Sequence, residues 1–135
     1  SDEKTLVIPD RPGNNRTDTL LNILDNPGVG MLFMVPGMNE TLRVNGTARI
    51  VTDAAVLDSM LVNERPPRSA LVVDVKEAYL HCAKAFMRSK LWSDEHRIER
   101  KSFPSLGQII TEQMGGGDVE AADRGIEEGY RTKLY

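Results

Sequence analysis

The chain has a single cysteine, Cys82, and two histidines among its 135 residues. One cysteine excludes an intramolecular disulfide and fits a reducing compartment, so we expect a cytoplasmic protein. The two histidines and the cysteine lack the clustered spacing of zinc or iron ligands, and the sequence therefore predicts no metal site. We also expect no nucleophile and base pair from His81 and Cys82, because neighbouring residues of a strand point to opposite faces and a buried cysteine usually behaves as a small apolar residue.

Long apolar runs and an excess of basic charge are missing as well. No segment approaches the roughly 20 apolar residues needed to span a bilayer, and the first residues, Ser1–Lys4, do not resemble a signal peptide. The 17 Lys and Arg residues against 20 Asp and Glu residues give a net charge of −3, which argues against a general nucleic-acid binder. The sequence therefore predicts a protein with neither a membrane nor a nucleic acid as its partner.

The apolar pattern predicts an α+β fold with five strands and two C-terminal helices. Strands are expected over residues 5–8, 29–35, 42–50, 70–75 and 78–86, the second of them buried, with a bulge at Asn45-Gly46 and a turn at Lys76-Glu77. Helices are expected over residues 17–24, from a cap at Thr52-Asp53 to about Val62, from Pro104-Ser105 to Met114, and from Asp118 towards Leu134. Residues 1–135 are expected to form one domain, with residues 104–134 as its helical extension.

The segment Ile8–Thr17 holds the densest group of anion-binding side chains. Within seven residues it has two arginines, two asparagines and a threonine: Arg11, Asn14, Asn15, Arg16 and Thr17. Arginine forks bind phosphate oxygens bidentately, and a helix capped by Thr17 or Asp18 would turn its positive end towards the same anion. The alternative is a solvated loop whose arginines pair with Asp10 and Asp18, and the spacing fits both interpretations equally well.

A second cluster lies in the segment Lys84–Trp92, at the expected end of the last strand. It combines cations and a hydroxyl group with the only tryptophan of the chain. This composition fits a ligand pocket, and it fits equally a basic surface turn in which Trp92 anchors the core.

Several of these segments together resemble the pyridoxamine 5′-phosphate oxidase-like flavoproteins, and most closely a subgroup known only as related to that oxidase. They are Ile8–Arg16, Asn26-Pro27, Glu40–Gly46, His81–Ala85, Arg88-Ser89 and Leu91-Trp92. The resemblance covers nearly the whole chain. It implies an FMN-binding split β-barrel that assembles as a homodimer with two flavins at the subunit interface. Relatives have a helix and at least two strands before the position of Thr5, so we expect that preceding sequence is missing here.

The resemblance also implies site residues. Arg11, Asn14, Asn15 and Arg16 correspond to positions that bind the phosphate and ribityl chain, and Thr41 to a position beside the isoalloxazine ring. Lys84, Arg88, Ser89 and Trp92 would complete the pocket from the other subunit. The arginine and histidine pair that binds pyridoxal phosphate in the oxidases has no counterpart near the C-terminus, which argues against vitamin B6 oxidation.

We therefore expect a dimeric FMN-binding oxidoreductase whose substrate is unknown and whose electron donor or acceptor is a small molecule. Two alternatives remain open at this point. One is a flavin-binding or redox-sensing module without turnover, and the other is a split barrel that binds haem or a deazaflavin.

Overall fold

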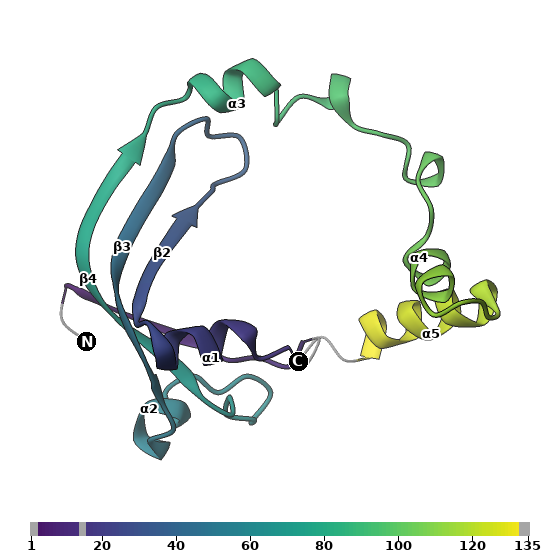
Figure 1. Ribbon diagram of the computed structural model, residues 1–135. Helices are drawn as coiled ribbons and strands as arrows, with labels where there is room; N and C mark the ends of the chain where they lie inside the picture. Colours follow the sequence, from purple (N-terminus) through teal and green to yellow (C-terminus); the bar gives the residue numbers. More distant parts are fainter. Residues whose placement is uncertain (1–2, 14–15, 133–135) are drawn as a thin grey trace. The chain divides into compact units, whose positions relative to one another are not determined.

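The computed structural model describes residues 3–13 and 16–132, and the chain divides into two compact units, residues 1–92 and 93–135. The first unit contains a four-stranded antiparallel sheet with the strand order β1-β4-β3-β2 (Figure 1). Its strands are β1 (Thr5–Pro9), β2 (Gly28–Phe33), β3 (Thr41–Val51) and β4 (Ala70–His81). Helices follow in the second unit, so the fold is mixed α+β, as the sequence predicts.

The strand β4 is continuous where the sequence predicted two strands. β3 pairs with it along its whole length, from Thr41 opposite His81 to Val51 opposite Ala70. Asn45 pairs with Glu77 and Gly46 with Val75, so Lys76 is the extra residue of a bulge. The predicted bulge at Asn45-Gly46 is confirmed, because the register shifts between these two residues. The predicted turn at Lys76-Glu77 is wrong, because β4 continues through both residues. The polar pair breaks the apolar pattern because this half of β4 is exposed, and an exposed strand face needs no apolar residues.

Three further expectations about local structure are corrected. β2 is an edge strand that ends at Phe33 and is mostly exposed, so the apolar run that follows Gly30 is not a buried strand of this chain. The helix α2 (Ala54–Asp58) begins as predicted, with Asp53 accepting from the backbone N–H of Val56, but it ends well before Val62. Residues 84–89 form a helix, α3, instead of a strand end, because Lys, Ala, Met and Arg are good helix formers and the sheet has already ended.

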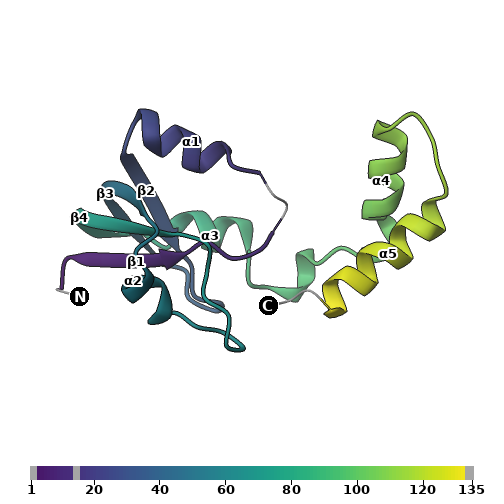
Figure 2. The same cartoon turned by 90° about the horizontal axis from the view of Figure 1, so that it is seen from below.

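The core of the first unit is small. Ile23 of α1 (Asp18–Asp25) packs on Ala48 of β3 and Val73 of β4, with half-buried apolar side chains around them. α1 thus covers one face of the sheet (Figure 2). A large part of the remaining apolar surface is exposed, including Leu32, Phe33, Met34 and Val35 at the end of β2.

The second unit contains two short 3₁₀ turns and a helical hairpin, α4 (Leu106–Gln113) and α5 (Val119–Thr132). The predicted caps are confirmed, since Ser105 accepts from the N–H of Gln108 at 3.0 Å and Asp118 from that of Ala121 at 2.9 Å. The glycines between the helices all have positive φ angles, which other residues rarely adopt.

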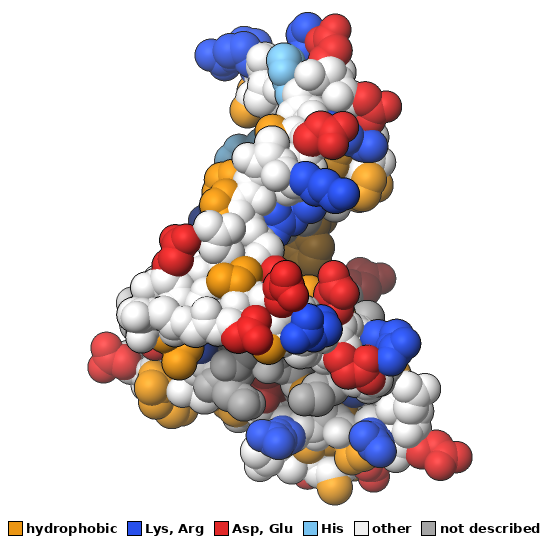
Figure 3. Space-filling view, turned by 90° about the vertical axis from the view of Figure 1, so that its right-hand side faces the viewer, with side chains coloured by type: hydrophobic (Ala, Val, Ile, Leu, Met, Phe, Trp, Pro, Cys, Tyr) orange, Lys and Arg blue, Asp and Glu red, His pale blue; other side chains and the backbone are white. Residues whose placement is uncertain are grey.

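No helix in residues 3–13 and 16–132 is long and apolar enough to cross a membrane. Acidic and basic side chains are interspersed on the face shown in Figure 3.

Candidate functional site

Three arginines surround one pocket beside the beginning of α1. Arg11 and Arg16, two of the predicted phosphate-binding residues, line it, and Arg68 joins them from the loop that leads into β4. The pocket has a volume of about 390 Å³, and its other lining residues are Asp10, Pro12, Gly13, Thr17 and Leu20. We call this site the arginine pocket. Sequence reasoning missed Arg68, because the prolines before it marked only a loop and nothing local links that loop to Arg11.

Hydrogen bonds hold together the segments that carry the arginine pocket. The backbone N–H of Asp10 donates to the carbonyl oxygen of Ser69 at 2.9 Å, and the Ser69 hydroxyl donates to the Asp10 carboxylate at 3.3 Å. These contacts join the end of β1 to the beginning of β4. The guanidinium of Arg11 also donates to the carbonyl oxygen of Met60. The pocket is thus assembled from segments that are far apart in the sequence.

The solvated-loop alternative is partly confirmed. Arg16 Nε lies 2.9 Å from Asp18 Oδ2, with both side chains well exposed, so this ion pair stabilises the fold by at most about 1 kcal/mol. Thr17 is the N-cap residue of α1, but its side chain makes no capping hydrogen bond. The first N–H groups of the helix therefore keep their capacity to face an anion. Asn14 and Asn15 lie outside the described residues.

A second hollow lies at the other end of the sheet. Its volume is about 330 Å³, and it is lined by Leu32, Met34, Thr41, Arg43, His81, Cys82, Ala85 and Phe86. We call it the Thr41 groove. Thr41 is buried, and it lies directly opposite His81 in the register of β3 and β4. Cys82 follows β4 and is exposed, which corrects the expectation of a buried strand cysteine.

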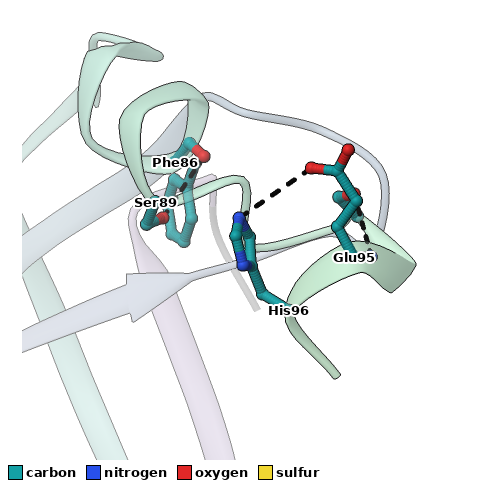
Figure 4. A network of polar contacts seen from close by, with 5 residues as sticks. Phe86, Ser89, Glu95 and His96 are labelled. Atoms are coloured by element: carbon teal, nitrogen blue, oxygen red, sulfur yellow. Dashed lines mark hydrogen bonds and ion pairs between the residues drawn. The ribbon is translucent and has the colours of Figure 1, made fainter. Parts of the chain in front are cut away.

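The helix α3 divides the predicted Lys84–Trp92 cluster between two surfaces. Ala85 and Phe86 line the Thr41 groove, whereas Lys84 and Arg88 line a separate shallow depression with Met87. This division follows from the helix, in which residues three and four apart share a face. The Ser89 hydroxyl donates to the carbonyl oxygen of Phe86 at 3.2 Å within the same helix (Figure 4). The sequence analysis missed Phe86 because it placed this segment in a strand.

Trp92 connects α3 to the loop between β2 and β3. Its indole Nε1 donates to the carbonyl oxygen of Met38 at 2.6 Å. Its ring stacks on Phe86, with centroids 5.8 Å apart and an interplanar angle of 16°. Trp92 therefore anchors a loop of its own chain, and through Phe86 it touches the wall of the Thr41 groove.

The arginine pocket and the Thr41 groove lie at opposite ends of β3 and β4. Arg11 follows Pro9, which pairs with Ala70 at the beginning of β4, whereas Thr41 pairs with His81 at its end. The 11 residues of β3 between these ends span about 33 Å when straight, at about 3.3 Å per residue. One extended FMN molecule is considerably shorter than this strand. The structure therefore does not bring Arg11 and Thr41 of one chain to a common small ligand.

The second unit has a hollow of its own, of about 960 Å³, lined in part by Arg100, Asp123, Glu127 and Tyr130. The Arg100 guanidinium donates to the carbonyl oxygens of Phe103 and Pro104, at 3.0 and 3.1 Å, so it stabilises the local turn. His96 lies 4.0 Å from the Glu95 carboxylate, and both side chains are exposed (Figure 4).

Comparisons with known proteins agree with this fold. Two solved structures of HupZ from Group A Streptococcus, the second of them a variant, are each 21% identical to this chain over 59% of its length, with TM-scores of 0.49 and 0.50. The chain spans 65% and 69% of the length of the two HupZ chains. At 21% identity, the second match supports a shared fold and carries no conclusion about function. No match to a curated protein was found. The family model of pyridoxamine 5′-phosphate oxidase matches residues 2–82, which include the whole sheet and both ends of β4, and the chain therefore belongs to the pyridoxamine 5′-phosphate oxidase family.

Proposed function

We propose that this protein binds FMN and acts as an oxidoreductase on a small molecule. The observation that carries the proposal is the arginine pocket, where Arg11, Arg16 and Arg68 surround a hollow beside the beginning of α1. Guanidinium forks and the N–H groups at a helix N-terminus are donors that suit a phosphate dianion. The family of the chain supports the choice of FMN as the ligand that carries the phosphate.

The Thr41 groove is the best candidate site for the isoalloxazine ring. Its walls are mainly apolar, from Leu32, Met34 and Phe86, and Thr41 and His81 add polar groups at one end. A flavin ring requires such a slot, with a few polar groups at its edge. When bound, FMN would supply hydride or electron transfer, and the residues named here would hold and orient it.

A homodimer is the second part of the proposal. One chain holds its arginine pocket and its Thr41 groove too far apart for a single FMN, so two chains are needed if both sites contact the same flavin. The exposed apolar run at the end of the edge strand β2 also requires a cover, since Leu32, Met34 and Val35 are each more than half exposed. We propose that this run lies in the interface.

Replacing Phe33, which is 44% exposed, tests the dimer. We expect Phe33→Glu to raise the dissociation constant of the dimer at least tenfold, because a carboxylate in an apolar interface loses its hydration. Sedimentation equilibrium at several concentrations measures this constant. Leu61→Glu, at an apolar position beyond α2 that is 51% exposed, is the matched control and should leave the dimer unchanged. An unaltered chain that stays monomeric at micromolar concentration would contradict the dimer.

Titration with FMN tests the cofactor, with Trp92 as the reporter. Because Trp92 is the only tryptophan and stacks on Phe86 in the wall of the Thr41 groove, we expect FMN to quench its emission strongly and saturably. Absorbance of the purified protein separates oxidised flavin from a haem Soret band. Prompt reduction of the bound flavin by a nicotinamide cofactor would favour an enzyme over a binding module. Unchanged Trp92 emission at saturating FMN would exclude the groove as the ring site.

A further inference from the structure

We propose that Arg43, held in place by Asn45 and Glu77, is the cation that meets the polar edge of the flavin ring in the Thr41 groove. This inference rests on the proposed function. It adds a residue that the sequence analysis did not name as a site residue and that lies outside the arginine pocket, and it gives a role to three polar side chains on one face of the sheet.

A chain of hydrogen bonds across two strands fixes the Arg43 guanidinium. Arg43 Nε donates to Asn45 Oδ1 at 2.7 Å, and Asn45 Nδ2 donates to Glu77 Oε2 at 2.8 Å. Arg43 and Asn45 are two residues apart on β3, and Asn45 pairs with Glu77 of β4, so all three side chains lie on one face of the sheet. The amide of Asn45 must therefore present its oxygen to Arg43 and its nitrogen to Glu77.

The side chain that this arrangement holds in place forms part of the wall of the groove. Arg43 is half-buried and lines the Thr41 groove, and on the same face of β3 it lies two residues from Thr41. Within the described part of the chain, its two terminal nitrogens have no hydrogen-bond partner. Fixed donors of this kind bind carbonyl oxygens and developing negative charge more strongly than mobile ones. The carbonyl-bearing pyrimidine ring of a flavin offers both.

Gly30 of β2 keeps this position open. It pairs with Asn45 in the register, and a Cβ atom at residue 30 would lie 2.5 Å from Arg43 Nη2 and 3.1 Å from Asn45 Oδ1. The guanidinium therefore passes directly over the backbone of the edge strand. Since the clash would involve the end of a flexible side chain, alanine at this position moves the guanidinium without removing its charge or unfolding the sheet.

The test compares Arg43→Gln and Gly30→Ala with the unaltered chain. Both variants should bind oxidised FMN with roughly tenfold lower affinity, through loss of a hydrogen bond from a charged donor. Both should also lose roughly tenfold in their preference for reduced over oxidised FMN, which lowers the two-electron midpoint potential by about 30 mV. Glu77→Ala should change the potential in the same direction, and Glu77→Gln, which keeps an acceptor for Asn45, should restore it.

Arg49→Gln is the matched control, because Arg49 is an exposed arginine of the same strand and lines neither site. It should leave both the affinity and the potential unchanged. If FMN binds and the Arg43 and Gly30 variants behave like this control, the role of Arg43 is wrong and the proposed function stands. If the unaltered chain binds no FMN, the proposed function and this inference both fail.

Discussion

Arg16→Gln should weaken FMN binding by roughly ten- to a hundredfold and leave riboflavin binding nearly unchanged. The loss of one charge-assisted contact to a phosphate removes about 1.5–3 kcal/mol of binding free energy, and riboflavin has no phosphate to lose. Arg68→Gln should have the same selective effect, because Arg68 lines the same pocket from an unrelated loop. Parallel titrations with the two ligands measure the difference.

Asp18→Asn separates phosphate binding from the surface ion pair. If Arg16 serves only to pair with Asp18, both substitutions remove the same contact and neither changes the affinity for FMN. If Arg16 binds the phosphate, Asp18→Asn leaves the affinity unchanged or raises it, because the competing carboxylate is gone. Equal weakening of FMN and riboflavin by Arg16→Gln would contradict a phosphate site in the arginine pocket.

Gly46→Ala should lower the free energy of unfolding by about 1–3 kcal/mol. A Cβ atom at this position would overlap the backbone carbonyl oxygen of Asp74 on β4 and lie 3.1 Å from Cγ1 of the core residue Val73. The overlap is with backbone at the bulge, so two paired strands must shift before the methyl group fits, and overpacking of this kind is destabilising. Urea denaturation followed by circular dichroism gives the value.

Thr47→Ala is the control for Gly46, because Thr47 is the next residue of β3 and its side chain is exposed. Its effect should stay within about 0.5 kcal/mol. A loss below this value for Gly46→Ala would mean that the bulge can be rebuilt at little cost. The close approach of β3 and β4 would then not be what requires glycine at this position.

Local patterns in the sequence were sufficient for most of the elements and their ends. The caps at Asp53, Ser105 and Asp118 were predictable because each side chain accepts a hydrogen bond from a backbone N–H only three residues further along the chain. The grouping of Arg11 with Arg16 was predictable for the same reason, as the two are five residues apart in the sequence. The family was recognisable from motifs spread along the chain, and the family model confirms it over residues 2–82.

Only the tertiary structure decided which distant segments meet. The strand β4 continues through Lys76 and Glu77 because β3 pairs with it on both sides of this point. The local sequence of β4 does not indicate which strand it pairs with. Pairing of β1 with β4 brings Arg68 to Arg11, and the end of β4 places Phe86 on a helix beside Thr41. The sequence by itself therefore determined the local chemistry of this protein. The separation of the arginine pocket from the Thr41 groove was decided by strand pairing, because pairing depends on contacts between residues that are far apart in the chain.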